Sequence, residues 1–339
     1  MPPMLNEKEI IICALCEFHF LTLREKIILL NKLDSSNSIA LLSINAIGDM
    51  IGRMPRCSSA FNANFILQNA RAAAAILSAR GISCCLYGQQ DYPALLKEIS
   101  DPPFALFYRG NFSVLQEKCV SVVGTRRLTA DGMNAAKAFA YDAALHGQTV
   151  VSGLAFGADA CSHAGAVAAA FDEMEKNGVF CERCGKTAAV LPCGIDCIVP
   201  NANKRIARQI LQTGGCLLSE YPPGVCAEKW RFVQRNRIIA GLSPATVIVQ
   251  APAGSGALIT ADFALDFGRD VVFLKSAVSA QAVKVSADSR KINKKLVRTV
   301  QQYIADGAPV VKDYEDFKAC MKDLPGKHSL QLCLDLEGI

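Results

Sequence analysis

The sequence has no long apolar run, only one tryptophan and only four histidines among its 339 residues. No hydrophobic stretch reaches the roughly 18 residues that a membrane-spanning helix requires. The first residues also lack the layout of a secretory signal, because Glu7, Lys8 and Glu9 precede a short apolar run that Glu17 interrupts. We therefore expect a cytoplasmic protein that has no membrane partner.

Two common nucleotide-binding motifs are missing as well. The first glycine-rich turn reads Gly-Thr-Arg-Arg-Leu-Thr from Gly124, which is not the GxGxxG fingerprint of dinucleotide sites. The later turn Gly254-Ser-Gly256 lacks the Gly-Lys-Ser/Thr ending of a Walker loop. The sequence thus disfavours NAD and ordinary ATP binding, and we expect no cofactor.

Composition indicates a globular protein with a mildly basic surface. Hydrophobic residues make up 51% and charged residues 20%, and the net charge is +5. This charge permits a polyanionic partner without requiring one, because a local patch matters more than the total. The 15 cysteines are expected to be reduced thiols, since the chain shows no secretory signal.

One group of cysteines has the residue types of a zinc site. Cys181 and Cys184 form a CxxC pair, and Cys193 and Cys197 follow. Four thiolates can hold zinc tetrahedrally. The second pair is not CxxC, however, so we expect separate thiols and no bound metal.

Residues 1–85 are predicted to form a small helical domain of the SAM or helix-hairpin-helix type. Apolar residues recur there at helical spacing over residues 7–15, 22–33, 38–50 and 62–80. The piece from Ile44 to Gly48 is a candidate turn between helices, either of a hairpin that contacts nucleic-acid backbone or of plain packing.

Residues 86–311 are predicted to form an extended Rossmann-like domain. Short continuous apolar strands alternate with helices from Cys119 onward, which is typical of a parallel sheet covered on both faces. The fold class is therefore α/β, a doubly wound, mostly parallel sheet behind the helical domain. Residues 312–339 are expected to be a short tail with one helix at 314–322, too short for a full winged-helix domain.

Glycines and cations follow several predicted strands. In a doubly wound sheet, ligands bind beyond the carboxyl ends of the strands. Arg126, Lys204 and either Arg235 or Arg237 come from separate loops at that edge, as a row of phosphates would require. The alternative is internal pairing of these arginines with acidic residues such as Glu220, because buried guanidinium groups need anionic partners.

The sequence offers no convincing arrangement of catalytic side chains. Ser162 and His163 are adjacent, and adjacent side chains on a helix do not face each other. We expect His163 to have a packing role. Asp159 and Glu220 remain candidates either for acid–base chemistry or for pairing with the arginines.

A series of segments carries a resemblance to a known family. They occur in order over about residues 87–311: Tyr92–Leu96, Asp101–Pro103, Val122–Arg126, Val150–Ala155, His163–Ala166, Ala189–Asp196, Leu217–Glu220, Arg235–Ser243, Ser255–Ala261 and Gly268–Val272. Together they resemble the DNA-processing protein A (DprA/Smf) family.

The resemblance implies a non-catalytic protein. It would bind single-stranded DNA without sequence preference, protect incoming DNA in natural transformation, load the recombinase RecA and act as a homodimer. The resemblance places the DNA-binding site at Gly124, Thr125, Arg126, Gly153, Asn203, Lys204, Asn236 and Arg237.

This sequence departs from the family pattern at several points. Phe156 stands where the family commonly has a basic residue, and Val199-Pro200 replaces the usual Tyr-Pro. The alternative hypothesis is a Rossmann-like enzyme that hydrolyses nucleoside monophosphates. Such enzymes share a glycine-rich loop and an acidic residue at a comparable edge, but their acidic Gly-Gly loop is missing here.

Overall fold

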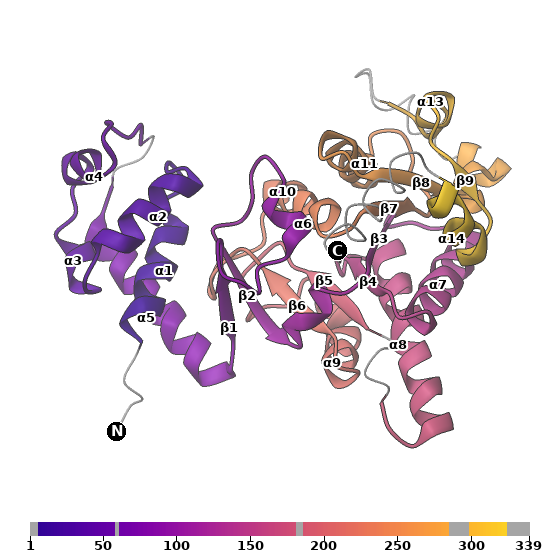
Figure 1. Cartoon of the computed structure of the whole chain (residues 1–339), viewed down its shortest axis with the longest axis horizontal. Coiled ribbons are helices and arrows are strands. Elements are labelled where there is room, and N and C mark those ends of the chain that lie inside the picture. The colour runs from indigo at the N-terminus through magenta and orange to yellow at the C-terminus, as the bar shows by residue number, and fades with distance from the viewer. Residues whose placement is uncertain (1–5, 58–60, 181–185, 285–297, 324–339) are drawn as a thin grey trace, which may run out of the picture.

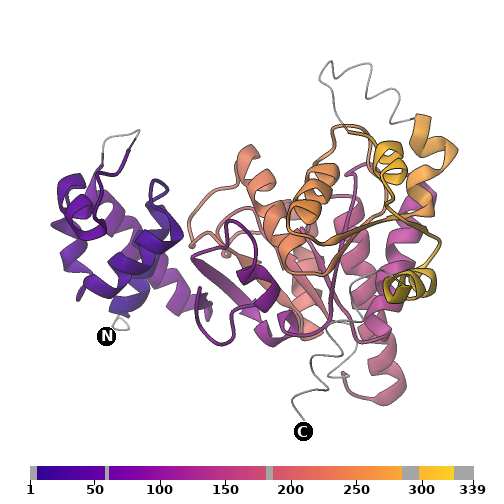
Figure 2. The ribbon, with the colours of Figure 1, turned by 45° about the horizontal axis from the view of Figure 1, so that its top comes forward.

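The structure is a computed structural model that describes residues 6–57, 61–180, 186–284 and 298–323. A group of helices occupies one end of the molecule and a large sheet with helices on both faces occupies the rest (Figure 1). The two parts stay distinct when the molecule is turned (Figure 2). The division into domains at residues 85 and 311 remains a prediction.

Within the described residues, five helices precede the first strand, and polar caps set where several of them begin. They are α1 (Glu7–Glu17), α2 (Leu23–Lys32), α3 (Asn37–Ala40), α4 (Ile44–Ile51) and α5 (Ala63–Arg80). Thr22 and Glu25 form a capping box on α2, and Asn62 caps α5. Gly81 ends α5 in the left-handed conformation, which glycine adopts without strain.

The prediction of a single helix over residues 38–50 was wrong, because this segment forms the two helices α3 and α4. Ser43 has extended backbone and its hydroxyl accepts from Ala46 N, so the chain breaks there and α4 begins. The segment Ile44 to Gly48 is consequently the start of a helix and not a turn between helices.

The described parts of the chain contain nine strands, which form one sheet. Their bounds are β1 (Ser83–Leu86), β2 (Ala105–Gly110), β3 (Cys119–Val123), β4 (Thr149–Ser152), β5 (Thr187–Val190), β6 (Cys216–Ser219), β7 (Ala245–Ile248), β8 (Asp270–Leu274) and β9 (Val310–Val311). The order across the sheet is β1-β2-β6-β5-β4-β3-β7-β8-β9. Strands β3 to β9 pair in parallel, whereas β1 and β2 add an antiparallel edge. The predicted α/β fold is confirmed.

Helices cover both faces of the parallel strands. One layer holds α7 (Ala130–Leu145), α8 (Ala158–Asn177), α9 (Lys204–Gln212) and α14 (Tyr314–Asp323). The other holds α10 (Lys229–Gly241), α11 (Gly256–Asp266) and α13 (Val300–Ala305). Because β4 to β7 are buried along their whole length, these strands read as continuous apolar runs.

Two later helices also end or begin at definite caps. Helix α8 continues to Asn177 and ends at left-handed Gly178. Thr299 and Gln302 form a capping box at the start of α13. The predicted tail helix is α14, which packs Phe317 against Phe139 of α7.

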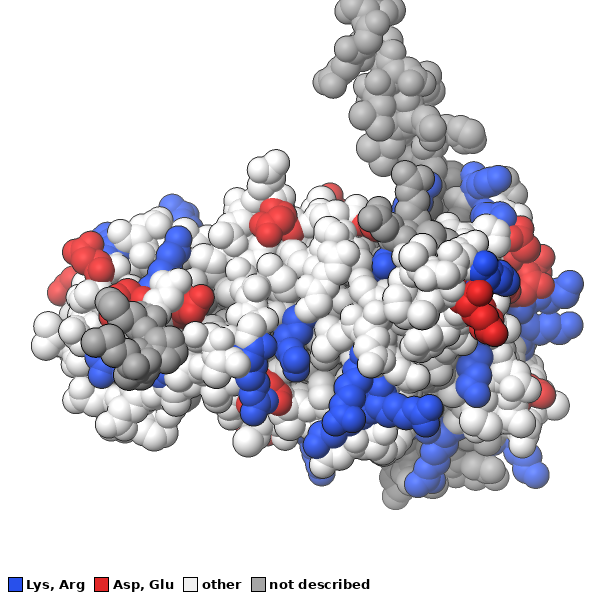
Figure 3. Space-filling view, turned by 90° about the horizontal axis from the view of Figure 1, so that it is seen from below, with Lys and Arg blue, Asp and Glu red and all other residues white. Residues whose placement is uncertain are grey.

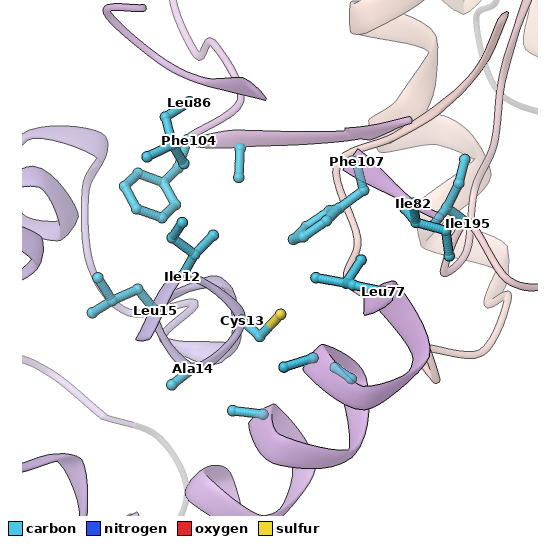
Figure 4. Close-up of a cluster of buried hydrophobic side chains, with 14 of the residues drawn as sticks. Ile12, Cys13, Ala14, Leu15, Leu77, Ile82, Leu86, Phe104, Phe107 and Ile195 are labelled. Atoms are coloured by element: carbon cyan, nitrogen blue, oxygen red, sulfur yellow. The ribbon is translucent and has the colours of Figure 1, made fainter. Parts of the chain in front are cut away.

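The helical end and the sheet share one hydrophobic core. Leu77 of α5 and Cys13 of α1 lie against Phe107 of β2, and all three are buried (Figure 4). The same cluster continues along the sheet to Leu217 of β6 and to Ile210 of α9. The N-terminal helices are therefore part of the layer that covers the antiparallel edge of the sheet.

Candidate functional site

A cavity of about 560 Å³ lies at the carboxyl ends of the parallel strands, beside β3. The sheet grows in opposite directions from β3, toward β4 on one side and toward β7 on the other. Such a switch point is where open α/β sheets bind ligands. The volume is that of an ordinary small-ligand pocket. Its walls come from the loops after β3 and β4, from α10 and from the start of α11.

Three exposed cations surround the cavity. Arg126 and Arg127 follow β3, and Lys229 begins α10. None of the three has an ion-pair partner in the described part of the chain. The Arg126 guanidinium lies 5.2 Å from the centre of the Phe232 ring, which also lines the cavity. The mouth therefore combines unpaired positive charge with an aromatic face.

A fourth cation, Arg235, forms the buried floor. Its side chain donates from Nη1 to Val190 O at 2.7 Å, and its Nε has no partner within the described residues. Burial lowers the pKa of Arg235, although the charge of Asp159 opposes this. Burial likewise raises the pKa of Asp159, against the effect of Arg235. The Arg235 guanidinium and the Asp159 carboxylate are thus both buried at the cavity wall, and each favours the charged form of the other.

Gly153 is required by the position of Arg235. A Cβ at residue 153 would lie 1.7 Å from Arg235 Nη1. Only glycine leaves room for the guanidinium there. Gly153 therefore supports the site from behind the cavity lining.

The loop after β4 is held by Asn203. Its amide nitrogen donates to Leu154 O at 2.8 Å and to Ala155 O at 3.2 Å. Leu154 has a φ of 57°, a left-handed conformation that is strained for a branched side chain. The buried Asn203 thus fixes a loop whose Ala155 lines the cavity, while Lys204 beside it is exposed on α9.

Arg237 has a different environment from Arg235. Its Nη2 lies 2.7 Å from Glu220 Oε2 and its Nε lies 3.1 Å from Asp101 Oδ2. Burial opposes the charge, but the two carboxylates together raise the pKa of Arg237. The structure does not bring Arg237 to the cavity, and its DNA-binding role remains a prediction. For Arg237 the internal pairing with Glu220 is confirmed.

The start of α11 closes the cavity on a third side. Ser255 precedes this 11-residue helix, and its buried hydroxyl has no partner in the described residues. Asn236 donates from its amide to Gly256 O at 3.2 Å, which ties α10 to the helix start. Backbone N–H groups and the helix dipole therefore present partial positive charge to the cavity.

Four of the eight predicted site residues line the cavity: Gly124, Thr125, Arg126 and Asn236. The sequence prediction missed Lys229, Phe232 and Arg127. The helical spacing of the sequence could have indicated Lys229 and Phe232. Residues 229, 232 and 236 recur at intervals of three and four and therefore share one face of α10.

The predicted packing role of His163 fits the structure. Its ring is fully buried and Nδ1 lies 2.7 Å from Thr187 Oγ1. Burial, and next the charge of Arg235, lowers its pKa to about 3. Ser162 instead donates to Ala158 O at 2.9 Å. The two adjacent side chains use different partners and do not form a nucleophile–base pair.

No cluster of three or more potential metal ligands occurs within the described residues. The Cys181–Cys184 pair lies outside them. Cys193 is buried and its thiol is 3.4 Å from Cys197 O. Among the described helices, none is long and apolar enough to cross a membrane.

Comparisons with a family model and with known sequences point to one family. The model of the DNA recombination-mediator protein A family matches residues 83–322. Protein Smf of Borreliella burgdorferi is 35% identical over 206 residues, which are 61% of this chain and 58% of that protein. DNA processing protein DprA of Bacillus subtilis is 37% identical over 193 residues, 57% of this chain and 60% of that protein. The chain thus spans little more than half the length of these curated relatives.

Solved structures are similar in fold. The crystal structure of DNA processing protein A from Streptococcus pneumoniae superposes with a TM-score of 0.63 at 28% identity, over 90% of this chain and 95% of that one. The protein of the same name from Helicobacter pylori, studied for its single-stranded DNA binding mode, gives a TM-score of 0.54 at 23% identity. That alignment covers 71% of this chain and 96% of the other.

Proposed function

This chain belongs to the DNA recombination-mediator protein A family, and from that premise we propose that it binds single-stranded DNA in the cavity beside β3. Binding is independent of base sequence and involves no catalysis. The protein protects DNA in natural transformation, acts as a cytoplasmic homodimer and loads RecA recombinase onto the strand.

The observation that carries the proposal is the set of unpaired cations around one cavity. Arg126, Arg127 and Lys229 have no ion-pair partner among the described residues, whereas the nearby buried Arg237 has two carboxylates. Phosphates neutralise such cations, and aromatic faces such as Phe232 stack with any base. Single-stranded DNA offers both groups in alternation along the strand.

The direct test is an oligothymidylate titrated by fluorescence anisotropy at several salt concentrations. The Arg126→Ala/Lys229→Ala variant removes two phosphate contacts. It is expected to weaken binding about tenfold and to lower the slope of log K against log salt concentration by about 1.4. The control is Lys137→Ala/Lys312→Ala, which removes the same charge from exposed positions on α7 and before α14. Unchanged binding by the cavity variant would contradict the proposal.

A second function, hydrolysis of nucleoside monophosphates, is favoured by one observation. Asp159 lines the cavity and burial raises the pKa of its carboxyl group. A raised pKa suits a general acid. Glu220, the other acidic candidate, is held by Arg237 through both carboxylate oxygens. Release of free base from nucleoside monophosphates, abolished by Asp159→Asn, would support this enzyme; no release by protein that binds the oligonucleotide would exclude it.

A further inference from the structure

The segment between β5 and α9 differs from its surroundings in charge. Helix α9 lies at the lower side of Figure 1, and lysine and arginine side chains gather in the middle of the face seen from below (Figure 3). Residues 191–203 contain neither of these residue types and only one acidic residue, Asp196. They do contain two cysteines, Cys193 and Cys197. The nucleophilic groups of this segment are therefore thiols.

A tight turn brings these two cysteines together. Cys197 N donates to Gly194 O at 3.0 Å, so residues 194–197 fold back toward Cys193. The Cys193 thiol in turn donates to Cys197 O, with Sγ and O 3.4 Å apart. Burial, and next the charge of the neighbouring Cys197, raises the pKa of Cys193 to about 12. Both contacts place the Cys193 sulfur beside Cys197, as a disulfide requires.

The surrounding chain holds the turn in place. Arg80 Nη1, at the end of α5, donates to Asp196 O at 2.9 Å. Ile195 is buried next to Ile82 (Figure 4). A Cβ at Gly194 would lie 2.6 Å from Asp196 Oδ1, so the turn is as tight as glycine permits. The fold therefore keeps the two thiols near each other, which favours their reaction with one another.

The two thiols differ in their access to solvent. Cys193 is fully buried, whereas Cys197 is exposed. Among the described cysteines, Cys226 is also exposed, and it lies on the loop after β6. Within the described ranges, no three histidine, cysteine or acidic side chains are placed to hold a metal ion. The chemistry of the turn is thus that of a thiol pair, in which the exposed member reacts first.

We propose that Cys193 and Cys197 are a redox site that forms a reversible disulfide when hydrogen peroxide reaches the protein. The Cys197 sulfur attacks one peroxide oxygen, which gives a sulfenic acid and releases water. The Cys193 sulfur then attacks the Cys197 sulfur, the S–S bond forms, and the hydroxyl group leaves with the Cys193 proton as a second water. The two thiols lose two electrons, which reduce the peroxide. In a reducing compartment the bond is transient, because thiol exchange returns both sulfurs to thiols.

The sequence itself supplies the assay. Trypsin cleaves after Lys186 and Lys204, and peptide 187–204 contains Cys193, Cys197 and no other cysteine. The full reduced chain is treated with hydrogen peroxide while folded, its remaining thiols are alkylated, and the digest is weighed by mass spectrometry. The peptide should be lighter by two hydrogen atoms and carry no alkyl group, and dithiothreitol should restore two alkylatable thiols. A peptide that still takes up two alkyl groups overturns the proposal. No nucleic acid is present, so the result does not depend on the proposed function.

Three single variants assign the role of each thiol. Cys193→Ala lacks the second thiol, so Cys197 should proceed to the sulfinic acid and the peptide should gain two oxygen atoms. Cys197→Ser should leave the buried Cys193 as a thiol. Cys226→Ser, the control on the neighbouring loop, should form the disulfide as the wild type does. A bond that joins peptide 187–204 to peptide 209–229, which carries Cys226, would overturn the proposal. Equal amounts of sulfinic acid in the wild type and in Cys193→Ala would overturn it as well.

Discussion

Two arginines, separated by one residue on α10, have opposite roles. Arg235 points to the cavity floor with part of its guanidinium unsatisfied in the described structure, and Arg237 is held by Glu220 and Asp101. On a helix, residues two apart do not share a face. Their different partners follow from this geometry, and they predict different effects when each is replaced.

Replacing Arg237 should affect folding first. Arg237→Met leaves Glu220, which is only 14% exposed at its side chain, without its partner, and breaking such a buried pair costs roughly 3–5 kcal/mol. The free energy of unfolding from urea titration measures this. Arg237→Met/Glu220→Gln should recover part of the loss. The pair has no structural role if the single variant is as stable as the wild type.

The buried ring of His163 makes stability depend on pH. Its pKa is about 3 in the folded protein and about 6.5 when unfolded, so the unfolded chain binds the proton first as pH falls. The contribution is fully present above about pH 6.5 and is lost progressively toward pH 3. Between about pH 7 and 5 the wild type should lose about 2 kcal/mol more than His163→Gln. Parallel pH curves of unfolding free energy would contradict this.

At the scale of elements, the site depends on where helices begin. The cavity lies against the start of α11, and the loop that carries Arg126 leads into the cap of α7. At that cap, Thr129 accepts from Gly132 N at 3.1 Å and from the amide nitrogen of Gln250 at 2.8 Å. Gln250 follows β7, so one threonine joins two loops beside β3.

Removing the cap of α7 should destabilise the fold measurably. Thr129→Ala leaves Gly132 N without its acceptor and should cost about 1–2 kcal/mol. Thr129→Ser keeps the hydroxyl and should cost much less. Both values come from denaturant titrations on matched proteins. Equal losses for the two variants would show that the hydroxyl is not what stabilises the helix start.

At the scale of the whole molecule, the N-terminal helices and the sheet are expected to unfold together. Their shared core runs from α1 and α5 to β2 (Figure 4), and the same cluster continues to Leu217 of β6. Helices joined to a sheet only by a linker would not bury Leu77 against Phe107. The only tryptophan, Trp230, lies on α10 and so reports on the sheet.

Leu77→Ala tests this coupling. Leu77 is 1% exposed, and such a truncation costs about 2–5 kcal/mol. Trp230 fluorescence and the helical circular dichroism signal should both shift to lower denaturant, by the same amount. Leu41→Ala, at an exposed position, is the control that should shift neither. A Trp230 transition that stays at its wild-type midpoint would show that the two parts unfold independently.

The sequence alone determined the alternation of strands and helices and the family to which the chain belongs. It also determined which edge of the sheet carries the candidate site. These follow from local patterns, since apolar runs, caps and glycines act over a few residues. The break at Ser43 was missed because two short helices in sequence have the spacing of one long helix.

Only the tertiary structure decided which cations line the cavity and which pair with carboxylates. Asp101 and Glu220 lie 136 and 17 residues from Arg237 in the chain, and no periodicity links them. The same holds for the close approach of Gly153 to Arg235 and for the hydrogen bond from Asn203 to Ala155 O. Such contacts arise when separate strands meet at one sheet edge, which is a property of the fold and not of any local segment.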